Sequence, residues 1–216
     1  MEFSHLLRKN YTIIVPSNKP HKVEALRGIL PDVDIIWFDG SGYPSWTKLW
    51  NEAVVASPTD LVIICQDKAR PTMVDIEKSL RLVDEGFGTV QMYCLGFVSF
   101  SKYVLDVIGW MDERLNGSGH HDCLIRHKEA DVAYYESLEV EYERSSSTWS
   151  FDDDSKFLYE KWDTDSRSKP IDYERRKIPD EVYDYQTNAK YRKFLPYSKS
   201  VILTGNTKLF ERRFLR

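Results

Sequence analysis

Three clusters of polar residues each follow a short apolar run in the N-terminal third of the chain. The clusters are Ser17 with Asn18, Asp39 with Gly40 and Ser41, and Gln66 with Asp67 and Lys68. Hydroxyl, amide and carboxylate groups brought together in this way can orient a small polar ligand such as a nucleotide. Turn residues that merely end three strands are the alternative, and they explain any one cluster more readily than all three. The repeated position favours one shared ligand cleft.

Strand-like and helix-like patterns alternate around these clusters. The predicted strands cover 11–16, 33–40 and 61–65. The predicted helices cover 21–30, 46–56 and 73–84, where apolar residues recur at helical spacing. The third strand is apolar throughout, which is typical of a buried parallel strand. Three such units predict a doubly wound α/β sheet, and ligands bind these sheets beyond the carboxyl ends of the strands.

The pattern changes beyond residue 86. One or two strands are predicted over 88–100, a short amphipathic helix over 101–109, and a helix over 120–130 after a Gly-rich loop. Alternating residues then predict β structure over 132–143. A polar loop, a short helical segment and an exposed linker are expected to follow.

The composition is that of a soluble globular protein, with 42% apolar and 30% charged residues among 216. No apolar run is long enough to span a bilayer, and the N-terminus does not resemble a signal peptide. Cys65, Cys94 and Cys123 are widely spaced and form no Cys-x-x-Cys pair. They are therefore expected to be buried free thiols rather than a disulfide framework or a zinc ribbon, which suits the reducing cytoplasm.

In order and spacing, several segments resemble the inverting "family two" GT-A glycosyltransferases, in particular the small single-domain members. The segments are TIIVPSNKP, IIWFDGSG, WNEAVVASPTDLVIICQDKARPT, FSKYVLDVIGWMDERLNGSGHHDCLIRHKEADVAYY and FLYEKWD. The resemblance implies a three-layer αβα sandwich with a mostly parallel central sheet. It places a catalytic domain at 1–163, with a donor half at about 11–86 and an acceptor half at about 87–163, before a C-terminal extension at 164–216.

The resemblance implies a nucleotide-sugar site in the donor half, with a uridine diphosphate sugar as the expected donor. Asp39 matches an aspartate that accepts a hydrogen bond from the base imide, and Asn51 matches a frequent asparagine near the donor. An asparagine on the helix surface is the alternative reading of Asn51. The other residues of the expected donor site are Pro16, Ser17, Asn18, Gly40, Ser41, Gln66 and Asp67.

The family holds a divalent cation, Mn²⁺ or Mg²⁺, with an Asp-x-Asp or Asp-Asp motif after the third strand. Here Gln66, Asp67 and Lys68 occupy that position, so Asp67 is the one carboxylate present. His120 is a candidate second metal ligand. Alternatively, Lys68 and Arg70 supply positive charge to the phosphates directly and reduce the dependence on metal.

The catalytic base is the second departure from the family pattern. The family's Glu-Asp pair, counted back from the Asp-x-x-x-Arg helix, falls on Gly119 and His120. His120, whose imidazole titrates near neutral pH, and Asp122 are the two candidate bases. The alternative for His120 is capping of the helix at the surface. The alternative for Asp122 is an ion pair with Arg126 that supports the helix. The family's late histidine is replaced by Glu143 or Arg144.

The acceptor is expected to bind near Trp110, Asp112 and Glu113. The two acids follow Gly109 and Trp110, which are expected to be exposed. Trp110 is a candidate stacking platform for a sugar or base. A tryptophan that packs in the core is an equal alternative.

The C-terminal extension combines positive charge with aromatic residues. From residue 190 onward eight Lys or Arg face one acid, so this segment carries +7 and the rest of the chain −11 of the total −4. Its aromatic residues are Tyr191, Phe194, Tyr197, Phe210 and Phe214. Such a pattern suits a polyanionic acceptor, such as DNA with hydroxymethylated bases. There are three alternatives. The extension docks on an anionic membrane that carries a glycan or lipid-linked acceptor, it clamps onto the acidic body of the same chain, or it contacts another subunit.

These features predict a hexosyl- or pentosyltransferase that moves a sugar with inversion to an acceptor hydroxyl. A catalytically degenerate nucleotide-binding protein is the alternative of another class, because the metal and base motifs are incomplete. A nucleotidyltransferase is less consistent with the sequence, because the segment PSNKP after the first strand is short and has no glycine for a phosphate loop.

Overall fold

The computed structural model describes residues 10–93, 95–117, 119, 122–123, 126–127, 130, 132–143, 154 and 157–158. Cys94, His120, Arg144 and the extension at 164–216 lie outside the described residues. The division into a catalytic domain and a C-terminal extension therefore stays a prediction.

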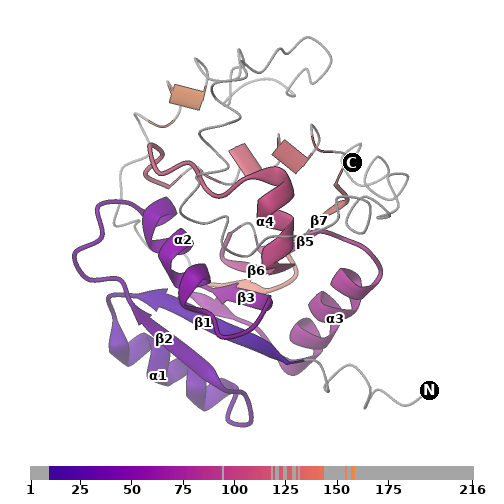
Figure 1. Cartoon of the computed structure of the whole chain (residues 1–216). Coiled ribbons are helices and arrows are strands. Elements are labelled where there is room, and N and C mark those ends of the chain that lie inside the picture. Colours follow the sequence, from indigo (N-terminus) through magenta and orange to yellow (C-terminus); the bar gives the residue numbers. More distant parts are fainter. Residues whose placement is uncertain are drawn as a thin grey trace.

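A six-stranded sheet forms the centre of the molecule (Figure 1). Its strands are β1 (Tyr11–Ser17), β2 (Ile35–Asp39), β3 (Leu61–Cys65), β5 (Thr89–Tyr93), β6 (Phe97–Ser101) and β7 (Tyr134–Glu136). Their order is β2-β1-β3-β6-β5-β7. Strand β6 is antiparallel to β3 and β5, whereas the other neighbours pair in parallel. The carboxyl ends of β1, β2 and β3 therefore lie at one edge of the sheet.

Helices cover both faces of this sheet. They are α1 (Pro20–Ile29), α2 (Trp46–Ala56), α3 (Met73–Asp84) and α4 (Lys102–Ile108). Buried residues of α1 and α3 join one apolar cluster with the sheet, and buried residues of α2 and α4 join another. The two clusters make a three-layer αβα arrangement, as the ribbon shows (Figure 1).

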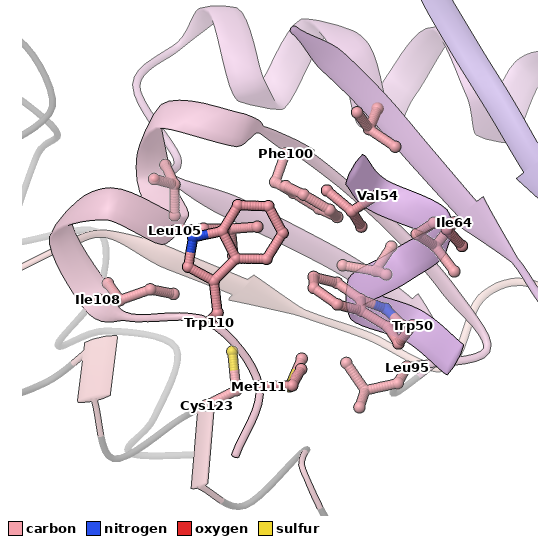
Figure 2. Close-up of a cluster of buried hydrophobic side chains, with 14 of the residues drawn as sticks. Trp50, Val54, Ile64, Leu95, Phe100, Leu105, Ile108, Trp110, Met111 and Cys123 are labelled. Atoms are coloured by element: carbon pink, nitrogen blue, oxygen red, sulfur yellow. The ribbon is translucent and has the colours of Figure 1, made fainter. Parts of the chain in front are cut away.

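The strand sequences explain why both faces are covered. In β1, Ile13 and Val15 belong to the cluster under α1 and α3, whereas Ile14 belongs to the cluster under α2 and α4. Successive side chains point to opposite faces of a strand, so a continuous apolar run buries both faces. On the α2 side the rings of Trp50 and Phe100 stack with centroids 5.1 Å apart, in the middle of the cluster shown in Figure 2.

A second, two-stranded sheet lies beside the end of β3. It consists of β4 (Ala69–Arg70) and β8 (Glu141–Tyr142), which pair antiparallel. The ring of Tyr142 stacks on Tyr93 with centroids 4.2 Å apart, and the Glu143 N–H donates to the Lys68 carbonyl at 2.9 Å. This sheet brings the end of the β8 strand to the turn that follows β3.

The predicted elements agree closely with the observed ones in the first hundred residues. The bounds of α2, β3 and α3 match the prediction, and the apolar run at 88–100 forms the two strands β5 and β6. The sheet is not purely parallel. The chain reverses between β5 and β6, so β6 runs antiparallel to its neighbours. The pairing of β4 with β8 was not predicted, since a two-residue strand carries no periodic signal.

The cysteines that the structure describes match the expectation of buried free thiols. Cys65 and Cys123 are free and buried, and burial raises the pKa of each thiol to about 12. Among the described residues, no helix combines the length and the apolar character that crossing a membrane requires.

Gly96 lies close to Tyr142 of the small sheet and to the backbone of Tyr93 in the central sheet. A Cβ atom at this position would lie 2.7 Å from Tyr142 Cε2 and 2.9 Å from the Tyr93 carbonyl oxygen. We expect Gly96→Ala to lower the free energy of unfolding by about 1–3 kcal/mol, because the backbone oxygen cannot easily move. Gly28→Ala is the matched control, since a Cβ in α1 meets nothing within 4 Å. This control should stabilise the protein by up to about 1 kcal/mol. Chemical denaturation of both variants checks the pair, and equal effects would contradict the packing.

Candidate functional site

The first and third polar clusters meet at the carboxyl edge of the sheet. The Ser17 hydroxyl donates to Asp67 Oδ2 at 2.5 Å, and the Lys19 N–H donates to Ser17 Oγ at 2.9 Å. The two residues come together because β1 and β3 are adjacent parallel strands whose polar clusters follow at the same edge. A short hydrogen bond to a carboxylate is a strong one, so the contact joins the two strand ends firmly.

The second cluster lies against the end of β1. Asp39 pairs with Ser17 in the parallel register, and the Gly40 N–H donates to the Ser17 carbonyl at 3.1 Å. A Cβ at Gly40 would lie 3.3 Å from the Ser17 carbonyl carbon and 3.4 Å from the Asn18 nitrogen. Glycine therefore allows the two strand ends to approach. All three predicted clusters lie at one place in the fold.

Asp39 presents an exposed carboxylate at this edge. Its Oδ1 accepts a hydrogen bond from the Ser41 N–H at 2.9 Å. The backbone hydrogen bond from Ser41 lowers the pKa of Asp39 below its usual value. The group is therefore an anion at neutral pH and can accept hydrogen bonds from a ligand N–H group.

Gln66 is held by the small sheet. Its side-chain oxygen accepts a hydrogen bond from the Tyr142 hydroxyl, and its N–H donates to the Gly96 carbonyl at 2.7 Å. These contacts connect Gln66 to the β4–β8 sheet, and its predicted contact with a donor stays a prediction.

An ion-pair network lies next to Asp67. Arg70 donates from Nη1 to the Asp67 carbonyl at 2.9 Å and from Nη2 to Glu143 Oε2 at 3.0 Å. Lys22 Nζ donates to the other oxygen of Glu143 at 2.7 Å. The hydrogen bond from Lys22 lowers the pKa of Glu143, and the charges of Lys22 and Arg70 act in the same direction. Lys22 is the residue here that sequence reasoning missed, because it is 121 positions from its partner and sits in an ordinary helical pattern.

The described residues do not supply the ligand set of a divalent cation. Such ions take several oxygen ligands, and within the described part of the chain no group of three or more His, Cys, Asp or Glu side chains is placed to hold a metal. Asp67 is bound by Ser17, and Glu143 is bound by two cations. The predicted second ligand, His120, lies outside the described residues.

Trp110 differs from the expectation of an exposed stacking platform. Its side chain is fully buried, with 0% exposed, and it lies in the cluster under α2 and α4 beside Leu105 and Ile108 (Figure 2). Apolar side chains surround the ring, so the core alternative holds. A sugar or base cannot stack on this ring unless the core opens.

Asn51 is a buried residue and does not lie on the helix surface. Its Nδ2 donates to the Met111 carbonyl at 2.9 Å and to Glu113 Oε1 at 3.2 Å. Its Oδ1 accepts from the Met111 N–H at 3.1 Å. Asn51 therefore fixes the backbone of the segment that was expected on the acceptor side, and its role toward a donor stays a prediction.

The two acidic residues of that segment have different surroundings. Asp112 is buried and forms a two-pronged pair with Arg114, through Nε at 2.9 Å and Nη2 at 2.6 Å. Glu113 is half-buried and accepts the hydrogen bond from Asn51. Asp112 thus has a structural partner for both carboxylate oxygens, whereas contact of either residue with an acceptor stays a prediction.

Asp122 forms a buried ion pair with Arg126. Arg126 Nε donates to Asp122 Oδ2 at 3.0 Å, and both side chains are nearly fully buried. Arg126 Nη1 also donates to the carbonyls of Ile108 and Gly109, at the end of α4. Arg126 therefore joins the buried pair to the end of α4, which favours the structural interpretation of the Asp-x-x-x-Arg motif. The other candidate base, His120, lies outside the described residues.

Comparison with protein-family models finds no match, and comparison with curated proteins finds none either. Two solved glycosyltransferases have a similar structure. One is glucosyl-3-phosphoglycerate synthase from Mycobacterium tuberculosis, in complex with Mn²⁺, UDP and glucosyl-3-phosphoglycerate. It is 11% identical with a TM-score of 0.51, and the match covers 68% of this chain and 77% of that one.

The other is a mannosyltransferase from Pyrobaculum calidifontis, in complex with GDP-Man and Mn²⁺. It is also 11% identical with a TM-score of 0.51, over 94% of this chain and 79% of that one. At this identity the likeness concerns the fold. The expected GT-A-like α/β sandwich with a mostly parallel sheet is confirmed.

His127, which follows Arg126, is a buried neutral histidine. Its Nε2 lies 2.8 Å from Thr89 Oγ1 and its Nδ1 lies 2.8 Å from the Cys123 carbonyl oxygen. Burial lowers its pKa from 6.5 to about 3. The unfolded chain therefore binds a proton below pH 6.5 that the folded protein does not, and this contribution to stability is present above pH 6.5 and lost as the pH falls toward 3.

We expect the free energy of unfolding to fall by roughly 1.4 kcal/mol per pH unit from this histidine, once the pH is well below the unfolded pKa. Denaturant titrations between about pH 6.5 and 4.5 measure the slope. His127→Gln should flatten it, whereas the control His21→Gln, an exposed residue of α1, should not. Parallel curves for wild type and His127→Gln would contradict the assignment.

Proposed function

We propose that this chain is a glycosyltransferase of the inverting family-two type, which moves a hexosyl or pentosyl group from a nucleotide sugar to an acceptor hydroxyl. The observation that carries this proposal is the meeting of Ser17, Asp39 and Asp67 at the carboxyl edge of a GT-A-like sheet. This edge is where open α/β sheets bind their ligands. The similar solved structures are glycosyltransferases with bound nucleotides, which supports the proposal.

The nucleoside part of the donor lies at the end of β1 and β2 in this proposal. The exposed, ionised Asp39 accepts a hydrogen bond from the imide N–H of uracil, and Pro16, Ser17 and Asn18 border the base and ribose. UDP in one similar structure and GDP-Man in the other show that related sheets accept both kinds of base. We favour uridine, because its imide offers a single N–H donor to one carboxylate oxygen.

The reaction is a displacement at the anomeric carbon of the sugar. The acceptor oxygen forms the new bond, the bond to the diphosphate oxygen breaks with its electron pair, and a base takes the acceptor proton. His120 and Asp122 are the predicted bases. The buried pairing of Asp122 with Arg126 favours His120 of the two.

A divalent cation would stabilise the charge of the leaving diphosphate in this chemistry. Mn²⁺ is present in both similar structures, which supports a cation in this fold. Asp67 and His120 stay the predicted ligands, and the dependence of activity on Mn²⁺ is left to measurement.

The acceptor is proposed from the basic, aromatic C-terminal extension. A polyanion such as DNA with hydroxymethylated bases fits its charge, and an anionic membrane glycan is the alternative acceptor. Retention of the protein on DNA that falls with added salt would support the first, and flotation with anionic liposomes the second.

A second function, nucleotide binding without catalysis, is favoured by one observation. Asp122, one of the two candidate bases, is buried in an ion pair with Arg126. In that case nucleoside diphosphates would bind, but no nucleotide sugar would be consumed.

We expect a nucleoside diphosphate to raise the melting temperature. A ligand that binds the native state alone, at about 100 times its Kd, adds about 2.7 kcal/mol of stability. For a chain of this size that corresponds to a shift of roughly 5–10 °C. Thermal scans with UDP, GDP and ADP, with and without Mn²⁺, measure it, and uridine is the control without phosphate. The absence of a shift with every diphosphate would reject a nucleotide-sugar site.

Asp67→Asn is expected to abolish turnover while leaving stability nearly unchanged. The amide keeps an oxygen that can accept from Ser17, but it loses the negative charge. We expect a loss of at least about 100-fold in the rate of nucleoside diphosphate release, the scale of one missing electrostatic contact in a site. Asp32→Asn, an exposed residue in the turn before β2, is the control. Full activity of the Asp67 variant would remove this residue from the mechanism.

A further inference from the structure

Two cations from distant parts of the chain hold one exposed carboxylate beside Asp67. Lys22 belongs to the first turn of α1, and Arg70 belongs to β4. Their contacts to the two oxygens of Glu143 are 2.7 Å and 3.0 Å. The Glu143 side chain is 43% exposed, whereas those of Lys22 and Arg70 are 18% and 23% exposed. The anion is therefore the member of the group that can leave without opening the fold.

We infer that Lys22 and Arg70 form the subsite for the diphosphate of the donor, and that Glu143 is an internal counter-anion which the diphosphate displaces. This inference rests on the proposed function, because it places the charged part of the same donor. In this inference the protein neutralises the leaving group with two of its own side chains, one of which contacts the Asp67 carbonyl.

The position of the pair fits the rest of the site. Arg70 Nη1 contacts the Asp67 carbonyl, and the Asp67 carboxylate contacts Ser17, so one run of contacts joins the cations to the end of β1. Lys22 lies in the first turn of α1, the helix that follows that strand. A nucleoside at Ser17 and Asp39 would therefore have its phosphates next to Lys22 and Arg70.

The start of α1 adds positive potential at the same place. Its first turn contains no acidic residue, and the N-cap residue Lys19 makes no side-chain capping hydrogen bond. The N-terminus of a helix attracts anions, because the helix dipole is positive there. Glu143, which follows β8, approaches Lys22 of this turn from outside the helix.

The chemistry of the two cations suits phosphate as well as carboxylate. A guanidinium offers a planar pair of N–H donors that matches either group, and an ammonium acts as a compact charge on phosphate. A diphosphate carries more negative charge than a single carboxylate and has more acceptor oxygens. It can therefore replace Glu143 on both cations at once. An exposed ion pair of this kind contributes little to folding, so its exchange is not opposed by stability.

Isothermal titration calorimetry in EDTA tests the inference, with UDP, GDP and inorganic pyrophosphate as probes. We expect Lys22→Gln and Arg70→Gln each to weaken diphosphate binding by about tenfold, which is the scale of a charge-assisted hydrogen bond. UMP binding should weaken less. Glu143→Gln should strengthen diphosphate binding by about threefold or more, because the competing anion is lost. Lys22→Arg, which keeps the charge, should bind within about threefold of wild type.

The control is Lys78→Gln, which breaks the ion pair between Lys78 of α3 and Glu139. This pair also joins separate segments of the chain, but within the described residues no hydrogen bond or ion pair joins Lys78 or Glu139 to Ser17 or Asp67. The control should bind diphosphates as wild type does. Melting temperatures of all variants show whether a loss of binding reflects a loss of folding.

The outcomes separate the inference from the proposed function. If wild type binds UDP or GDP and both charge-removing variants bind equally well, the inference is wrong and the proposed function stands. Equal weakening by Glu143→Gln and by Lys22→Gln would show a purely structural network and would also overturn the inference. Diphosphate binding that is seen in Mn²⁺ but not in EDTA would also overturn the inference. If wild type binds no nucleoside diphosphate with or without Mn²⁺, both proposals fail.

Discussion

The hydrogen bond from Ser17 to Asp67 is the contact on which the proposed site depends. It joins the ends of β1 and β3 at 2.5 Å, and the backbone of Ser17 also receives the Gly40 N–H from the end of β2. Three strand ends are thereby held at one edge of a sheet that is buried on both faces. A ligand at this edge meets polar groups that the fold has already ordered, so little conformational entropy opposes its binding.

Charge is distributed around that contact in a way that suits a nucleoside diphosphate. Asp39 presents an exposed anion at the end of β2, whereas Lys22 and Arg70 meet at Glu143 and Arg70 contacts the Asp67 carbonyl. Asp39 can therefore accept hydrogen bonds from a base, and the two cations can neutralise phosphates.

Most of the fold could be predicted from the sequence, because its elements carry strong local signals. The apolar strand Leu61–Cys65 and the helix Met73–Asp84 lie where periodicity places them. The three polar clusters were also predicted, because each of them directly follows an apolar strand. Contacts between distant segments were not predicted. The pairing of Lys22 with Glu143 depends on a two-residue strand without any pattern, and the burial of Trp110 depends on α2 and α4 covering the same face.

The most direct test of the account is a mass-spectrometric screen of nucleotide sugars. Each donor is incubated with wild-type protein and with pools of glycan and hydroxymethylated DNA acceptors, in Mn²⁺ and in EDTA. The account predicts that at least one nucleotide sugar is consumed, with release of its nucleoside diphosphate and an equal amount of one acceptor heavier by a hexosyl or pentosyl group. Donors that all stay intact, while a nucleoside diphosphate binds the protein, would contradict glycosyl transfer and leave a nucleotide-binding protein.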